Sequence, residues 1–331
     1  MPKNYESFSD EPTELDKKCA ELIGLFDASR PSLDDFRGRR NYDEAQIDRD
    51  QAALAAKEAN YDYHGGEISA LDQDKVLEAM LQYMGAHDQI FVQESYAEPS
   101  TDYDDSFNGA DVIFGLPQKL GARDVVFNVD ACTAITPAAI AKKFNKTENN
   151  AKPDSPGCNR LMYFAHGKTR TRISPSPHYI IGAMPACVSN AADKFDLDDA
   201  EITNEVDESL RRKILIELYI QSKTGALACK NIEDRTDFTE KAQKAHKSVV
   251  KASALALCQS FNIDPKKKDA ASKLTKAING FYDAECHHDD TFKYIWRESI
   301  TRYNRETAIA KARAANKTAT NLGPNPTPAM A

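Results

Sequence analysis

The sequence lacks the short motifs that mark several large enzyme classes. It contains no Gly-x-x-x-x-Gly-Lys-Ser/Thr loop, no Gly-x-Gly-x-x-Gly, no Gly-x-Ser-x-Gly and no His-Glu-x-x-His. These motifs cradle phosphates on backbone N–H groups, position a nucleophilic serine or ligate zinc. Their absence argues against nucleotide hydrolases of the P-loop type, dinucleotide-dependent dehydrogenases, serine hydrolases with a nucleophile elbow and zinc peptidases.

The cysteines do not follow the spacing of disulfide-rich or zinc-binding proteins. The seven cysteines are an odd number, and no two of them form a Cys-x-x-Cys pair. This argues against a disulfide framework or a zinc ribbon. We expect reduced thiols that serve as small apolar side chains.

Long apolar runs are absent as well. No run approaches the roughly 20 residues that a membrane-spanning helix needs. Residues 1–18, MPKNYESFSDEPTELDKK, are polar and acidic and lack the apolar segment of a signal peptide. We therefore expect a cytoplasmic protein without a membrane partner.

Charge is present in quantity but is unevenly distributed. Residues 1–130 contain 12 Lys and Arg against 28 Asp and Glu, a net charge of −16. Residues 131–331 contain 31 against 23, a net charge of +8. Such asymmetry is typical of self-complementary packing, of a basic surface that binds a polyanion, or of two differently solvated surfaces.

Hydrophobic periodicity predicts a mixed α/β (α+β) protein, in which a small mixed sheet is flanked by helices. The 331 residues divide into an N-terminal helical extension (1–65), a mixed core (66–195), a C-terminal helical region (196–315) and a disordered tail (316–331). Helical spacing predicts helices starting at Thr13 and over 43–60, 71–84, 205–223, 237–261, 269–282 and 290–315. Short β-rich runs predict strands at 90–92, 111–116, 123–133, 161–165 and 179–184.

The stretch from Gly109 to Asn145 carries the clearest local signals. Its two β-rich runs are joined by a short loop with Pro and Gly, which predicts an antiparallel hairpin. Thr136 is a suitable N-cap and Pro137 fits the first helical position, so a helix should follow the hairpin.

Two carboxylates in this hairpin are candidates for chemistry. Strand alternation puts Asp130 on the face opposite Phe127 and Val129, while Asp111 lies across the hairpin. A carboxylate at the end of a buried strand needs a cation, a metal or N–H donors. Two carboxylates on paired strands can hold one Mg²⁺ with waters and a substrate phosphate, and the ion then activates water for phosphodiester hydrolysis. In the structural alternative, Asp130 caps the loop before Thr136 or pairs with a nearby lysine.

The order of these features resembles the PD-(D/E)XK nuclease superfamily over residues 70–185: a helix, a hairpin with an Asp on its first strand and an acidic residue on its second, then a helix and a further strand. The resemblance implies that Asp111 and Asp130 are catalytic metal ligands. It also implies that Glu78, on the preceding helix, can add a carboxylate. The family has a lysine two residues after the second acidic residue, where this chain has Cys132. Lys142 or Lys143, on the next helix, would reach the site instead.

A basic segment lies between the last two predicted strands, over residues 166–178, and is expected to form a turn. Lys168, Arg170 and Arg172 alternate within it. Residues of this type bind a phosphate backbone, which makes them candidate nucleic-acid-binding residues. The alternative is a solvated loop that pairs with the acidic first part of the chain.

Residues 285–290, Glu-Cys-His-His-Asp-Asp, concentrate metal-ligating side chains. Adjacent side chains diverge, so few of them could bind one ion. We therefore favour a loop in which Asp289 or Asp290 caps the last helix over a zinc site.

The sequence thus leads to two hypotheses from different classes. In the first, the protein interacts with DNA or RNA and hydrolyses phosphodiesters with Mg²⁺ at Asp111 and Asp130. In the alternative, it is a non-catalytic interaction or assembly protein that self-associates through its helical extensions and its acidic and basic surfaces.

Overall fold

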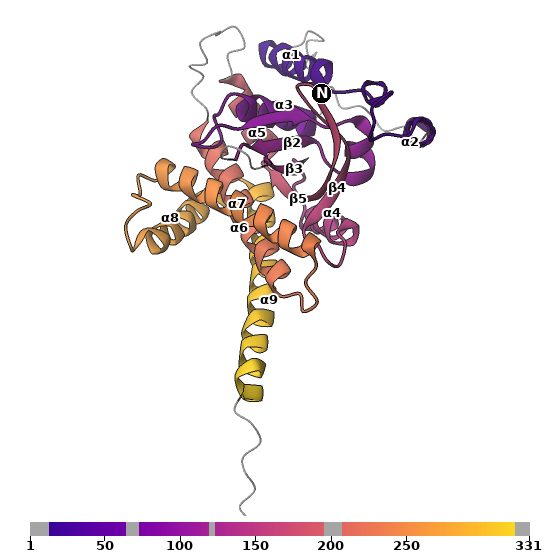
Figure 1. The fold of residues 1–331 in the computed structure, drawn as a ribbon. Helices are drawn as coiled ribbons and strands as arrows, with labels where there is room; N and C mark the ends of the chain where they lie inside the picture. Colours follow the sequence, from indigo (N-terminus) through magenta and orange to yellow (C-terminus); the bar gives the residue numbers. More distant parts are fainter. Residues whose placement is uncertain (1–12, 64–72, 119–122, 195–206, 322–331) are drawn as a thin grey trace, which may run out of the picture.

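The computed structural model describes residues 13–63, 73–118, 123–194 and 207–321 (Figure 1). The strands are β1 (Tyr96–Pro99), β2 (Val112–Leu116), β3 (Val125–Cys132), β4 (Cys158–His166) and β5 (Thr169–Gly182). The helices are α1 (Glu14–Ser29), α2 (Glu44–Tyr63), α3 (Gln73–Ala86), α4 (Pro137–Asn150), α5 (Pro185–Asp193), α6 (Glu208–Lys230), α7 (Asp237–Ser260), α8 (Ala270–Glu285) and α9 (Asp290–Asn321), with short helical turns η1 (Leu33–Phe36) and η2 (Asp104–Asn108). The predicted mixed α/β class, with helices on both sides of the core, is confirmed.

The described strands form one mixed sheet in the order β1-β2-β3-β5-β4. β1, β2 and β3 make an antiparallel meander, and β4 is antiparallel to β5. β3 and β5 run parallel, because the chain crosses through α4 and β4 between them. The predicted hairpin is therefore confirmed, with Val112 paired to Val129 and Leu116 paired to Val125.

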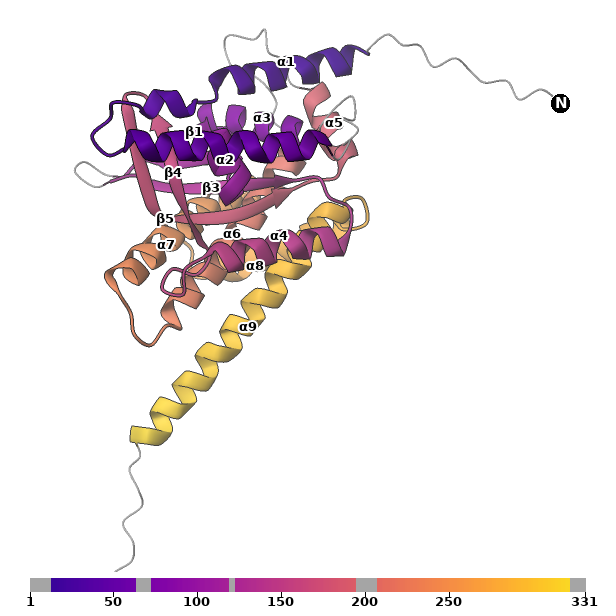
Figure 2. The ribbon, with the colours of Figure 1, turned by 90° about the vertical axis from the view of Figure 1, so that its right-hand side faces the viewer.

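The two faces of the sheet are covered by different helices. Figure 2 shows α1 and α3 on one side, and α4 and α9 on the other. Phe127 and Val129 belong to the main hydrophobic core, which extends from Cys19 in α1 to Trp296 in α9. A smaller cluster lies on the opposite face, where Cys132 and Ile180 of the sheet meet Ile140, Phe144 and Ile295. The predicted alternation along β3 is therefore correct.

Side chains of α6 complete the backbone pairing of β5. β4 pairs with β5 only up to Pro177. Beyond that point, the N–H and C=O groups on the edge of β5 that faces away from β3 need other partners. Gln221 accepts from Ile180 N at 2.9 Å and donates to Ile180 O at 2.6 Å. Glu217 accepts from Gly182 N at 3.0 Å. α6 is thereby fixed against the end of β5 by hydrogen bonds as well as by apolar packing.

Several local predictions were correct because a specific cap defined them. Thr13 caps α1 in a capping box with Asp16. Thr136 accepts from Ala139 N at 3.3 Å, and Pro137 is the first residue of α4. α7, predicted over 237–261, is capped by Thr236, which forms a capping box with Thr239.

Other boundaries were predicted wrongly. Residues 90–92 are not a strand, and β1 forms in a segment for which no strand was predicted. Residues 169–178 are not a turn but the first part of β5, because their alternating polar side chains suit a strand with one wet face. α5 was missed, and α9 continues to Asn321 although a disordered tail was expected from residue 316. Residues 1–12 and 322–331, for which disorder was expected, lie outside the described residues.

A buried charge cluster joins the C-terminal helices to the core. The Lys213 ammonium lies 3.0 Å from Asp289 Oδ2 and 3.1 Å from Glu285 Oε2, and Asp289 is fully buried. Asp289 Oδ1 accepts from Phe292 N at 2.9 Å and from Met184 N at 3.0 Å. Asp289 thus caps α9, as expected. No group of three or more His, Cys, Asp or Glu in the described ranges is arranged to hold a metal, so nothing there supports the zinc alternative.

We predict that Lys213→Met lowers the free energy of unfolding by roughly 3–5 kcal/mol, because it leaves the Asp289 charge buried without its counter-charge. Chemical denaturation measures this change. Lys273→Met is the matched control, since Lys273 forms an exposed pair with Asp269 and its loss should have little effect. Equal effects of the two substitutions would contradict the prediction.

Candidate functional site

Asp111 and Asp130 meet at the start of β2 and the end of β3. Asp111 N donates to Val129 O at 2.8 Å, and Asp111 Oδ2 accepts from Ala131 N at 2.6 Å. Asp111 therefore contacts the residues on both sides of Asp130. Both aspartates are only 6% exposed. The two carboxylates that the sequence singled out are brought together in a largely buried setting.

The chain enters this site through a tight turn. The π-helical turn η2 ends at Gly109, which has φ of +69°. A Cβ atom at Gly109 would lie 3.4 Å from Asp130 Oδ2 and 3.3 Å from Lys146 Nζ. Glycine satisfies both requirements, because it tolerates positive φ and leaves room for the carboxylate and the lysine.

Lys143 reaches Asp130 from α4. Its Nζ donates to Asp130 Oδ1 and to Ala131 O, both at 2.5 Å. Lys142 is exposed, and in the described part of the chain it makes no contact with either aspartate. Cys132 is fully buried, and burial raises its pKa to about 11, so it is an apolar core residue. Of the two lysines that the sequence offered, Lys143 is the one at the site.

A second layer of charges surrounds the pair, and the sequence analysis missed most of it. Arg30, at the end of α1, lies 3.0 Å from Asp105 and 3.5 Å from Glu78. Glu78 is on α3, at the position that the resemblance suggested. Arg30 and Asp105 carried no signal in the sequence, because one follows a helix end and the other lies in a segment without periodicity. Only the folded chain brings them together.

The electrostatics of the site reflect too many buried carboxylates for the available cations. Burial, then the charges of Glu78 and Asp130, raises the pKa of Asp111 well above its ordinary value. Burial also raises the pKa of Asp130, against the opposing effect of Lys143. For Lys143, burial alone would lower the pKa, but the charge of Asp130 outweighs it and the pKa is raised. Lys143 is therefore a permanent cation at neutral pH.

The donor set suits a hard divalent cation. The described residues contain no cluster of three or more metal-ligating side chains. Mg²⁺, however, is usually bound by one or two carboxylates together with waters and substrate oxygens. Asp111 and Asp130 supply carboxylate oxygen atoms, of which Asp130 Oδ1 is bonded by Lys143, and the raised pKa of Asp111 indicates a site that gains from added positive charge.

The three basic residues predicted to bind nucleic acid lie on the β4–β5 hairpin. Lys168 is in the turn and is exposed. The Arg170 guanidinium lies 5.9 Å from the centre of the Phe36 ring, and that of Arg172 lies 5.1 Å from the centre of the Tyr42 ring. Neither arginine contacts Asp111 or Asp130 among the described interactions. Arg170 does line a cavity of about 250 Å³ together with Arg30, which in turn contacts the second layer of the site.

We predict that Asp111→Asn raises the melting temperature at pH 8. A carboxyl whose folded pKa exceeds its unfolded value destabilises the folded state as the pH rises through that range. Asparagine removes the charge and keeps an oxygen for Ala131 N. A gain of about 1 kcal/mol would correspond to roughly 2–4 °C.

The gain should disappear as the pH falls toward the ordinary Asp value of 3.8. Thermal unfolding by circular dichroism across this pH range measures it. Asp124→Asn, at an exposed position just before β3, is the control and should change little. A lower melting temperature of Asp111→Asn at pH 8 would contradict the prediction.

Comparisons with known proteins add no relative. No family model, no curated protein and no solved structure matches the chain. None of the helices in the described part combines the length and hydropathy that a bilayer crossing requires. Function is therefore argued from the geometry of the site.

Proposed function

We propose that the protein acts on nucleic acid and hydrolyses phosphodiester bonds with Mg²⁺ at Asp111 and Asp130. One observation carries the proposal. A lysine from the following helix, Lys143, donates to Asp130 at 2.5 Å and so supplies the cation that Cys132 cannot supply two residues after Asp130. A site of this type combines two carboxylates and one lysine, and this chain assembles all three from different elements.

The roles of the residues follow from their charges. Asp111 and Asp130 would hold the Mg²⁺. The bound ion would polarise the phosphate and activate a water molecule. Lys143, with its raised pKa, stays protonated and would stabilise the negative charge that develops on the phosphate, so it is not the general base. Glu78 and Asp105 add negative potential that favours the cation.

The order of the elements supports the same proposal. α3, the β2-β3 hairpin, α4 and the strands that follow have the order of elements on which the resemblance to PD-(D/E)XK nucleases is based. The aspartates lie at corresponding points, at the start of β2 and near the end of β3.

Groups suited to nucleic acid surround the site. Lys146 Nζ lies next to Asp130, and Lys57 lies 5.2 Å from the centre of the Phe107 ring, which is 37% exposed. An exposed aromatic ring beside lysines is suited to stacking an unpaired base while the lysines neutralise phosphates. These groups support DNA or RNA as the substrate.

A second candidate is a non-catalytic binding module. It is favoured by the bond that Lys143 already makes to Asp130, because a buried carboxylate with a lysine partner is also a stable structural pair. In that case the basic residues would bind nucleic acid or a partner protein without cleavage. Metal-dependent cleavage separates the two candidates.

The test is a cleavage assay with single- and double-stranded DNA and RNA in the presence of Mg²⁺ or Mn²⁺. We expect cleavage by the native chain, and a loss of at least about 100-fold in Asp130→Asn and in Lys143→Met, which is the effect of removing a metal ligand or an electrostatic stabiliser. Lys142→Met, one residue away and exposed, should retain the native rate.

Calorimetric titration with Mn²⁺ adds a readout independent of activity. Asp130→Asn should lose Mn²⁺ binding, whereas Lys143→Met should keep it, because Lys143 competes with the metal for Asp130 Oδ1. Absence of both cleavage and Mn²⁺ binding in the native chain would reject the nuclease proposal and favour the binding module.

A separate prediction concerns the basic hairpin. Lys168→Ala should weaken binding to DNA or RNA and reduce the salt dependence of the affinity by about one released ion. Arg172→Ala should change the salt dependence less, because its guanidinium already packs on Tyr42. Fluorescence anisotropy at several salt concentrations measures both. An unchanged salt slope in Lys168→Ala would remove this residue from the interface.

A further inference from the structure

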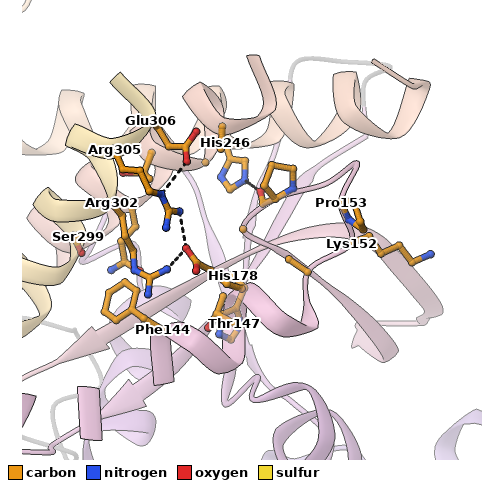
Figure 3. Close-up of a pocket in the computed structure, with 18 residues that line it drawn as sticks. Phe144, Thr147, Lys152, Pro153, His178, His246, Ser299, Arg302, Arg305 and Glu306 are labelled. Carbon is orange, nitrogen blue, oxygen red and sulfur yellow. Dashed lines mark hydrogen bonds and ion pairs between the residues drawn. The ribbon is translucent and has the colours of Figure 1, made fainter. Parts of the chain in front are cut away.

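A cavity of about 360 Å³ lies between α4, α6, α7 and α9 (Figure 3). The loop at residues 151–157 and strand β5 complete its walls. The volume falls within the range of pockets that bind small molecules. Asp111 and Asp130 are not among the residues that line it. The following inference therefore does not rest on the proposed function.

The interior of this cavity is largely apolar and uncharged. Phe144 of α4, Pro156 of the loop and Ala228 of α6 contribute carbon surface. His178 and His246 also line the cavity, and burial lowers the pKa of these side chains to about 3 and about 4. Both imidazoles are therefore neutral at pH 7.

The charged side chains that α4 and α9 place on the wall are paired with one another. Glu148 pairs with Arg302 and, at 2.9 Å, with Arg305. Arg302 also pairs with Glu298 at 2.9 Å, and Arg305 pairs with Glu306 at 3.3 Å. A charged ligand would have to break one of these ion pairs to find a counter-charge.

Lys152 lines the cavity as well, but it does not place a charge inside it. Figure 3 shows its side chain directed away from the cavity, and its ammonium lies 5.9 Å from the centre of the Phe238 ring. An ion that entered the cavity would lose its hydration without gaining an unpaired partner, and such a transfer is costly. The cavity therefore favours an uncharged molecule.

One polar group on the wall has no partner. The Ser299 hydroxyl is buried, with the residue only 2% exposed, and it makes no hydrogen bond within the described part of the chain. Ser299 lies four residues after Ile295 and three before Arg302, so the three share one face of α9.

That face of α9 is turned toward α4. Ile295 belongs to the same apolar cluster as Phe144, and the Arg302 guanidinium lies 5.0 Å from the centre of the Phe144 ring. The Ser299 hydroxyl therefore lies on the cavity side of the helix. A buried hydroxyl without a partner is costly, and a ligand that bonds to it would recover that cost.

We propose that this cavity binds an uncharged small molecule with an apolar body and one hydrogen-bonding group, such as a hydroxyl. The apolar body contacts Phe144, Pro156 and Ala228, and the polar group forms a hydrogen bond with the Ser299 hydroxyl. An apolar interior with a few polar groups is the common design of ligand pockets. The paired charges disfavour an ion, and the unpartnered hydroxyl favours a ligand with a polar group over a plain hydrocarbon.

The test uses three probes that share one ring system: 1-naphthol, naphthalene and 1-naphthoate. The first two are uncharged at pH 7, and only 1-naphthol of these two has a hydroxyl. We expect saturable binding of 1-naphthol at one site. Naphthalene should bind about fivefold more weakly, which corresponds to one hydrogen bond. The 1-naphthoate ion should bind at least about tenfold more weakly than 1-naphthol. Calorimetric titration of the full chain measures all three.

A pair of matched serine variants tests the hydrogen bond. Ser299→Ala should lower the affinity for 1-naphthol about fivefold and leave that for naphthalene unchanged. Ser253→Ala is the control, because Ser253 is also buried and also has a hydroxyl without a partner in the described residues, but it does not line the cavity. It should keep the native ratio of the two affinities.

A second pair of variants locates the binding. Ala228→Phe fills the cavity and should abolish binding of 1-naphthol and naphthalene. Ala271→Phe, at an exposed position on α8, should leave both affinities unchanged. Circular dichroism and the melting temperature show whether each variant is folded. If Ala228→Phe does not fold, Ser299→Ala still decides the location, since it removes a single oxygen atom and keeps the shape of the wall.

Four results would overturn the proposal. They are the absence of saturable 1-naphthol binding, equal affinities for 1-naphthol and 1-naphthoate, undiminished binding by folded Ala228→Phe, and an unchanged preference for 1-naphthol over naphthalene in Ser299→Ala.

Discussion

The bond between Lys143 and Asp130 is the contact on which the centre of the molecule depends. β3 carries Asp130 into the interior, where a carboxylate is tolerated only with a counter-charge. Lys143 provides it from α4, and the same ammonium bonds Ala131 O, so one side chain joins the helix to the end of the strand. The start of β2 is fixed at the same place, because Asp111 forms hydrogen bonds with the backbone of the residues on both sides of Asp130.

The helix that carries Lys143 also borders a cavity. α4 has one side turned to the carboxylates and another turned to the cavity lined by Phe144 and Glu148. Both sites therefore share a wall, although they differ in chemistry: one is crowded with buried carboxylates, and the other is lined largely by apolar surface.

Local signals in the sequence were sufficient for the hairpin, for the cap of α4 and for the core face of β3. Each of these depends on residues within a few positions of one another, such as Thr136 with Pro137, or Val129 with Asp130. The lysine at the site was also among the two candidates, because α4 follows β3 directly. The sequence did not predict Arg30 or Asp105 at the site, nor the length of β5. Those features depend on contacts between segments that are distant along the chain, and hydrophobic periodicity does not predict such contacts.

The hydrogen bonds from Gln221 and Glu217 to β5 have a consequence for how the chain can be divided. A strand whose outward N–H and C=O groups are unpaired is a template on which another chain can add its own strand. α6 covers that template with side chains, and so acts as a shield against edge-to-edge aggregation. A fragment that ended before α6 would keep every strand of the sheet but would expose the unpaired end of β5 to its neighbours. The C-terminal helices therefore protect the solubility of the sheet as well as its stability.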